Sequence, residues 1–151
     1  MGNAYLLSGL HNGPLIVKWI VERAPMEIYD TRTDPERFTF REIIAHLVDW
    51  EPIVVSRMRQ TIERPGSVLI VWDEAQRAVD GKYGETDPRE QAEKLIVLRQ
   101  ETIRFLQDEA SGNWDATVTH PERGPQSLYD MANLELGHDT YHVEQLLQFL
   151  P

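Results

Sequence analysis

His138 and His142, two histidines four positions apart, are the residues of this sequence whose type and spacing most directly suggest chemistry. The stretch around them, residues 127–150, repeats its apolar residues with helical spacing, so we expect one amphipathic helix there. Residues four apart in a helix share a face, with Cβ atoms roughly 5–6 Å apart. Two imidazoles at that distance can bind one metal ion. The same spacing would also suit two ordinary histidines that make their own hydrogen bonds.

Glu135 precedes His138 by one helical turn and lies on the same side of the expected helix. The stripe that contains all three polar residues is apolar at both ends and polar in the middle. This pattern is typical of a site buried inside a helical bundle. It makes Glu135 a candidate partner of a metal ligand, or a candidate ligand itself.

A third metal ligand is needed, and His46 is the candidate. Thr39 and Glu42 form a capping-box pattern that begins a helix extending to about Glu63, and His46 falls near the middle of its buried stripe. A lone histidine on such a face is also compatible with a satisfied core residue. Asp49, three residues further on, could orient the His46 imidazole or simply face solvent.

The composition narrows the chemistry and the partners. Because the chain has no cysteine, disulfides, a thiolate nucleophile and thiolate metal ligands are excluded. The net charge of −10, with basic residues interleaved with acids, argues against a nucleic acid partner. No apolar run reaches the roughly 20 residues that span a membrane, and the N-terminus lacks a signal-peptide pattern. We expect a single cytoplasmic domain over residues 1–151.

The periodicity predicts four helices around one core, an all-α fold. Their expected ranges are 14–23 with an earlier turn at 4–10, then 39–63, 87–109 and 127–150. Pro14 should lie in the first turn of its helix, and Pro52 should bend the second. The long connection at residues 65–86 would allow the second and third helices to run parallel.

The connections contain short extended runs. Val68–Trp72 is β-like, and Trp72 could form the wall of a pocket, although packing of this run on the bundle surface explains it equally well. Residues 117–119 could form a small strand. His120 comes just before a proline in a turn that looks exposed, so we do not expect it to bind metal.

Three separated motifs give the chain a resemblance to a known family. Residues 38–49 (FTFREIIAHLVD), 120–130 (HPERGPQSLYD) and 137–145 (GHDTYHVEQ) resemble, in the same order, three motifs of the DinB-like (DinB/YfiT-like) superfamily. The similarity extends over about residues 10–150. It implies a four-helix bundle in up-down-down-up order, with a long crossover between the second and third helices, and often a homodimer.

The resemblance also implies one divalent metal ion, commonly zinc or nickel, held by three histidines. By motif position these are His46, His138 and His142, with water in the remaining positions. Asp139, which follows His138, would serve packing or ligand orientation. Glu135 is an acid where the family has an apolar or small residue, so it could supply a fourth ligand. Either Glu135 or Asp49 could act beside the metal or as a general base.

The family contains transferases that use low-molecular-weight thiols, and other members are described as metal-dependent hydrolases. The resemblance therefore implies a metal-dependent enzyme, with a thiol S-transferase acting on small electrophiles as the first hypothesis and a hydrolase as an alternative. A metal-binding or dimerisation module without turnover is a further alternative, because a fold does not establish a function. An open coordination position beside a cavity would favour the enzyme, and a closed coordination sphere would favour the module.

Overall fold

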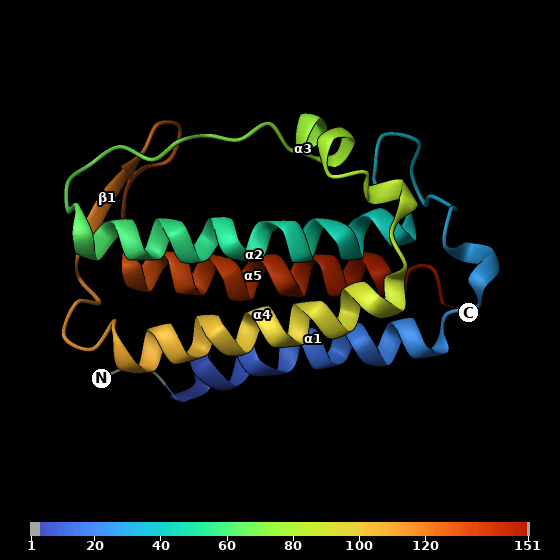
Figure 1. Cartoon of the computed structure of the whole chain (residues 1–151), viewed down its shortest axis with the longest axis horizontal. Helices are drawn as coiled ribbons and strands as arrows, with labels where there is room; N and C mark the ends of the chain where they lie inside the picture. Colours follow the sequence, from blue (N-terminus) through green and yellow to red (C-terminus); the bar gives the residue numbers. More distant parts are fainter. Residues whose placement is uncertain (1–3, 151) are drawn as a thin grey trace.

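Four long helices dominate the computed structural model, which describes residues 4–150 (Figure 1). The elements are α1 (Ala4–Arg23), the 3₁₀ turn η1 (Met26–Ile28), α2 (Phe40–Glu63), α3 (Glu74–Asp80), the 3₁₀ turn η2 (Tyr83–Glu85), α4 (Pro88–Asp108), β1 (Thr117–His120), β2 (Gly124–Ser127) and α5 (Leu128–Leu147). The all-α four-helix bundle expected from the sequence is confirmed. No helix among residues 4–150 is both long and apolar enough to cross a membrane.

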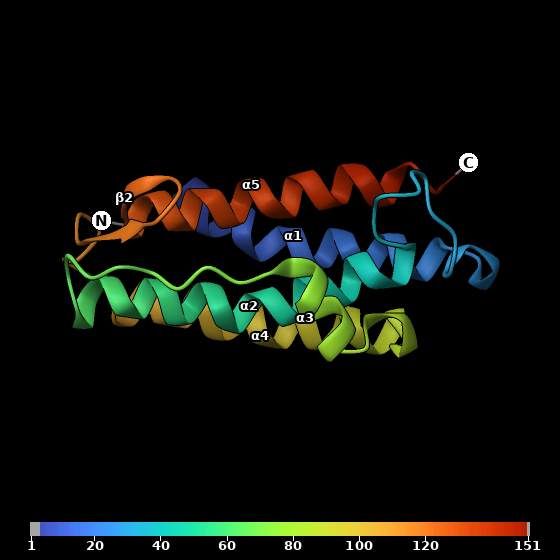
Figure 2. The same ribbon diagram turned by 90° about the horizontal axis from the view of Figure 1, so that it is seen from above.

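The helices follow the order up, down, down, up. Figure 1 shows α1 and α5 running in one direction and α2 and α4 in the other. Each of α1 and α2 packs against both α4 and α5. Because α2 and α4 are parallel, the chain between them must return along the length of the bundle, and Figure 2 shows this segment passing over α2.

The helix starts follow the capping residues of the sequence. The hydroxyl of Thr39 accepts a hydrogen bond from the N–H of Glu42, and the Glu42 carboxylate accepts one from the N–H of Thr39. Ser127 and Asp130 form the same reciprocal pair at the start of α5. These bonds satisfy backbone donors that a helix start leaves without partners, so each cap fixes where its helix begins.

α1 begins earlier than the sequence predicted, because Pro14 lies inside the helix and does not start it. A proline has no N–H, so the carbonyl four residues before it loses its helical partner. Here that carbonyl belongs to Leu10, and it accepts a hydrogen bond of 2.9 Å from the guanidinium of Arg99 on α4. The side chain thus replaces the missing backbone bond, and the helix continues through the proline.

The segment between α2 and α4 contains more structure than its loop-like sequence suggested. Its first part pairs with β1: the N–H of Leu69 donates to the carbonyl of Thr119, and the N–H of Thr119 donates to the carbonyl of Ser67. β1 pairs in turn with β2 as an antiparallel hairpin. Further on, Asp73 caps the short helix α3 through the N–H of Gln76. The small strand predicted near residues 117–119 is confirmed, whereas α3 was missed.

A layer of charged residues divides the bundle core into two apolar halves. One half includes Val17, Phe40, Leu47, Leu95 and Leu146, and the other includes Leu10, Met58, Phe105, Val118 and Leu128. Between them, at the middle of α2, α4 and α5, lie Glu51, Arg99, Glu135 and Asp139, each at most 3% exposed. The histidines lie close to this layer.

Candidate metal centre

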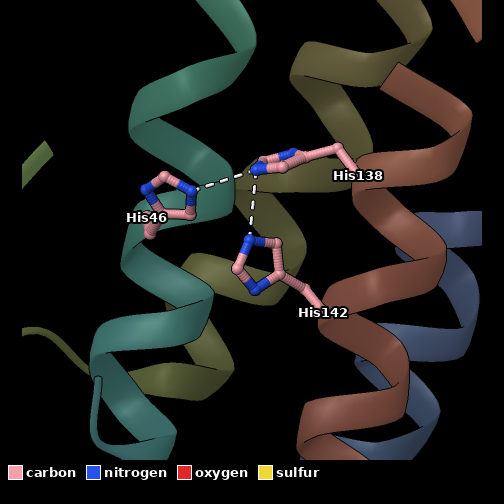
Figure 3. A group of neighbouring side chains, drawn as sticks. All are labelled: His46, His138 and His142. Carbon is pink, nitrogen blue, oxygen red and sulfur yellow. Dashed lines mark hydrogen bonds between the residues drawn. The ribbon is translucent and has the colours of Figure 1, made fainter. Parts of the chain in front are cut away.

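The three histidines predicted as metal ligands meet between α2 and α5 (Figure 3). His46 projects from α2, while His138 and His142 project toward it from successive turns of α5. The Nε2 atom of His138 lies 3.0 Å from that of His46 and 3.1 Å from that of His142. One ligand atom from each ring lies within 4.8 Å of the other two. The two histidines spaced four apart on α5 therefore meet the histidine of the buried stripe of α2 at a single point.

Aromatic rings surround this histidine cluster. Trp50, one turn after His46 on α2, has its ring centre 5.7 Å from that of His46 and 6.1 Å from that of His138. Phe38 lies 5.5 Å from His46, and Tyr141 lies 5.2 Å from His142. These rings limit the access of water to the sides of the imidazoles.

All three imidazoles are neutral near pH 7. Burial lowers the pKa of His46 to about 3, that of His138 to about 2 and that of His142 to about 4. For His46 and His138 the neighbouring histidines lower the pKa further, because a second positive charge nearby would repel the first. Neutral imidazoles keep the lone pairs that a metal ion needs.

Protons alone cannot satisfy the three Nε2 atoms. His142 Nδ1 lies 2.8 Å from Gln145 Oε1 and donates its hydrogen there, which leaves a lone pair on His142 Nε2. His138 Nε2 faces this lone pair and also faces His46 Nε2. If His138 Nε2 carries a hydrogen, it can donate that hydrogen to only one of the two neighbouring nitrogens. If His138 Nε2 carries no hydrogen, its lone pair points at the lone pair of His142 Nε2. A cation at the centre would accept all three lone pairs.

The geometry fits a divalent cation. Ligand nitrogens of a tetrahedral zinc site, at about 2.0–2.1 Å from the metal, lie roughly 3.3 Å from one another. The two contacts of 3.0 and 3.1 Å are close to that value. Gln145 orients His142 in the way that hydrogen-bonding partners usually orient metal-binding histidines. The donor set therefore suits one metal ion with coordination positions left open.

Glu135 and Asp49, the two acids predicted beside the metal, have other partners in the structure. Glu135 accepts a hydrogen bond of 2.9 Å from Arg99, and its carboxylate is not among the ligand atoms that converge at the histidine cluster. Asp49 accepts bonds of 2.6 and 2.8 Å from Arg77 and one of 2.6 Å from the hydroxyl of Tyr83. Asp49 thus ties α3 and η2 to α2. A catalytic role for either acid stays a prediction.

Arg99 and Glu51 are buried charged residues that sequence reasoning missed. The Arg99 guanidinium donates two hydrogen bonds to Glu51, at 2.7 and 2.8 Å, and others to Glu135 and Asp139. The hydroxyl of Thr102 also donates to Glu51. Three carboxyl groups thus share one guanidinium. Burial and the neighbouring acids raise the pKa of Glu135 well above its ordinary value, and burial raises that of Asp139.

The helical spacing of the sequence carried a signal for this layer. On α4, Leu95, Arg99, Thr102 and Leu106 follow one another at intervals of four, three and four, and all are buried. On α2, Leu47, Glu51, Val54 and Met58 follow the same intervals. A charged residue at an inward position on two helices is the pattern that marks paired buried charges. The predicted packing role of Asp139 is in keeping with its place in this layer.

A pocket of about 990 Å³ opens beside the histidine cluster. His138 and Trp50 line one end of it, and Trp72 and Val71 of the connecting segment form part of its wall. His120, which we expected in an exposed turn, is 3% exposed and also lines this pocket. Its Nδ1 accepts hydrogen bonds from the N–H groups of Glu122 and Arg123, so the tight hairpin buries the ring. His120 is not one of the three clustered histidines.

Comparison with known proteins agrees with the fold. The structure of YfiT from Bacillus subtilis, described as a probable metal-dependent hydrolase with an unusual four-helix bundle topology, superposes with a TM-score of 0.86 at 18% sequence identity. The match covers 96% of this chain and 83% of YfiT. No functionally curated protein matches the chain. The sequence profile of the DinB superfamily matches residues 16–146, and the chain belongs to that superfamily.

Proposed function

We propose that this protein is a metal-dependent enzyme in which His46, His138 and His142 hold one divalent cation, zinc or nickel. The observation that carries this proposal is the convergence of three neutral, buried imidazoles at one end of a pocket. Such a cation, when bound, lowers the pKa of a coordinated water or thiol toward neutrality. Because the three ligands are neutral, they do not reduce the charge available for this effect.

The reaction that we propose first is transfer of a low-molecular-weight thiol to a small electrophile. The chain has no cysteine, so the sulfur must come from a substrate. The pocket beside His138 gives room for a second small molecule. Trp50 and Trp72 line it with apolar surface, which would shield a thiolate from bulk water and favour an apolar electrophile next to it.

Hydrolysis is the second candidate, and the description of YfiT as a probable metal-dependent hydrolase is what favours it. The same three histidines would serve both reactions, since either requires an anionic nucleophile, thiolate or hydroxide. The alternative of a closed, non-catalytic metal site has less support, because the Glu135 carboxylate that could close it is bonded to Arg99.

Metal analysis of untagged protein tests the proposal. We expect about one metal ion per chain in the wild type and a loss of metal in the His46→Ala and His142→Ala variants. His11→Ala is the matched control, because His11 is exposed on α1 and lies outside the histidine cluster. Wild-type protein that takes up no metal from supplemented medium, with both site variants equally stable, would refute the metal enzyme.

An assay on the metal-loaded protein then separates the two reactions. Thiol conjugation is followed with a chromogenic aryl halide and a small thiol, and hydrolysis is followed with an aryl ester in the absence of thiol. Thiol-dependent product formation that disappears in His142→Ala supports transfer. Ester cleavage that needs metal and no thiol supports hydrolysis.

A further inference from the structure

The end of the pocket away from the histidine cluster carries two arginines that form no salt bridge within residues 4–150. Arg57 lies on α2 and Arg123 lies in the turn of the β1–β2 hairpin, and both line the pocket together with His120. The pocket therefore extends from His138 along α2 and α5 to the hairpin. Its two ends differ in chemistry, with neutral nitrogen ligands at one and fixed positive charge at the other.

Among the described residues, Arg57 is held in place by a hydrogen bond and a ring contact and has no ion pair. Its Nη2 donates a hydrogen bond of 2.9 Å to the carbonyl of Ile70, and its Nε–H is buried without a partner. The guanidinium carbon lies 5.2 Å from the ring centre of Trp50. One face of the guanidinium is thus positioned by the protein, while donor capacity is left over, which is a common property of arginines that bind ligands.

The acids near this end do not pair with either arginine. Within residues 4–150, no salt bridge joins Arg57 or Arg123 to a carboxylate, although Glu74 and Glu122 also line the pocket. Two other lining acids are engaged elsewhere, since the Asp130 carboxylate accepts a hydrogen bond from the N–H of Ser127 and Glu135 accepts one from Arg99. Other arginines of this acidic chain do have carboxylate partners, among them Arg32, Arg41, Arg59, Arg77 and Arg99.

The positive groups at this end repel one another. Burial, and then the charge of Arg123, lower the pKa of Arg57. Burial, and then the charges of Arg123 and Arg57, lower the pKa of His120, while Glu122 opposes this effect. A negative ligand between the two arginines would relieve this repulsion, and no carboxylate within residues 4–150 forms a salt bridge with either of them. Two neighbouring arginines that form no salt bridge, one of them half-buried, are a recognised arrangement for binding an oxyanion.

We propose that Arg57 and Arg123 bind the carboxylate or phosphate group of a small-molecule substrate whose reactive end lies at the histidine cluster. The anion site itself follows from the arginines, and only the position of the reactive end rests on the proposed function. Trp50 separates the two ends, with its ring near both Arg57 and His138. The substrate is therefore an elongated acid whose middle section packs on an indole ring.

Titration of metal-free protein with inorganic phosphate and with succinate tests this site. The indole N–H signals of Trp50 and Trp72 in a ¹H–¹⁵N NMR spectrum report on binding, because both rings line the pocket. At constant ionic strength, we expect saturable shifts of these signals with at least one of the two anions. The anion that gives saturable shifts shows whether the site prefers a phosphate or a carboxylate. Potassium chloride serves as the control for ionic strength.

Charge-removing variants assign the binding to the arginines. We expect Arg57→Gln and Arg123→Gln each to weaken anion binding by about tenfold or more, since each removes a charge-assisted hydrogen-bond donor. Arg104→Gln is the matched control, because Arg104 is exposed on α4, bonds only the carbonyl of Gln100 and does not line the pocket. Non-saturating shifts, shifts equal to those with chloride, or binding that survives both variants would overturn the proposal.

The two proposals fail in different ways. His46→Ala should lose metal and keep anion binding, whereas Arg57→Gln should keep metal and lose anion binding. A wild-type protein that binds no metal but binds anions through Arg57 would refute the metal enzyme and leave the anion site standing. Normal metal uptake without anion binding would refute the anion site alone.

Discussion

Replacing Arg99 with methionine should destabilise the protein strongly, and more at alkaline than at acidic pH. Arg99 is the cation of the charged layer, where it donates hydrogen bonds to Glu51, Glu135 and Asp139 and to the carbonyl of Leu10. Methionine has a similar length and no charge, so the substitution leaves the volume largely filled. Its main effect is to leave three buried carboxyl groups without their shared cation.

The expected loss follows from the cost of uncompensated buried charge. Removing one partner of a buried ion pair typically costs about 3–5 kcal/mol in the free energy of unfolding. The lost bond to the Leu10 carbonyl, which Pro14 leaves without a helical donor, adds about 1–3 kcal/mol. The carboxyl groups can recover part of this loss by taking up protons. We therefore expect a loss of about 4–6 kcal/mol at pH 8.

The pH dependence has a defined sign. The pKa of Glu135 and that of Asp139 are raised in the folded protein, so the folded state binds protons more tightly than the unfolded state. Stability from these groups is fully present below the ordinary carboxyl pKa and is lost as the pH rises through the folded pKa. Without Arg99 the folded pKa values rise further. The difference in the free energy of unfolding between wild type and Arg99→Met should therefore be smaller at pH 5 than at pH 8.

Urea unfolding of metal-free protein at the two pH values measures these differences. Arg104→Met is the control on the same helix, and it should change stability by no more than about 0.5 kcal/mol because its side chain is exposed. Glu135→Gln removes one surplus acid and should cost little, or stabilise, at pH 8. A loss below about 1 kcal/mol for Arg99→Met at pH 8, or an equal loss at both values, would refute the argument from buried charge.

Three further predictions concern the site and its surroundings. Gln145→Leu removes the acceptor of His142 Nδ1–H and should weaken metal binding about 10- to 100-fold, as measured by competition with a chelator. An undiminished affinity would show that the orientation of His142 does not depend on this bond. Gly13→Ala should lower the melting temperature by several degrees, because a Cβ there would collide with the Asp139 carboxylate; an unchanged melting temperature would contradict the close packing of α1 on α5. The stability that the three histidines contribute to the metal-free protein should fall as the pH drops below about 6.5 toward 4, since their pKa values are depressed on folding and the unfolded chain then binds more protons; because Glu135 and Asp139 contribute in the opposite direction, the urea titration compares the wild type with His46→Ala, and the variant should be less destabilised by acid.

The histidine cluster was predictable because two independent local patterns pointed to it. The spacing of His138 and His142 places them on one face of a helix whatever the fold, and the capping box at Thr39 fixes the start of α2 and hence the stripe that contains His46. That α2 faces α5 was inferred from the resemblance to the family motifs. Periodicity alone does not specify which helix faces which.

The partners of the acids could not be read from the sequence. Glu135 and Asp49 were candidates for a role beside the metal because each lies within one turn of a histidine along the chain. In the structure their partners are Arg99 and Arg77, which are distant in sequence. Long side chains reach across helix interfaces in ways that depend on helix rotation. An acid near a candidate ligand is therefore weak evidence for a role at the metal.

The missed elements have physical causes of the same kind. α3 has only seven residues, too few for its periodicity to stand out, and its Asp73 cap was the single local signal. Pro14 looked like a helix start because proline often occupies that position. Its place inside α1 depends on a hydrogen bond from Arg99, a residue on another helix.

The charged layer also explains how the histidines can face α2 so closely. Asp139 follows His138 on α5, so their side chains point about 100° apart around the helix axis. Arg99 holds Asp139 against α1, where Gly13 leaves room for it. Fixing Asp139 fixes the rotation of α5, and this rotation sets the direction in which His138 projects. The buried charges would cost stability if unpaired, so a rotated α5 that separates Asp139 from Arg99 is disfavoured. The charged layer thus aligns the side chains of the histidine cluster.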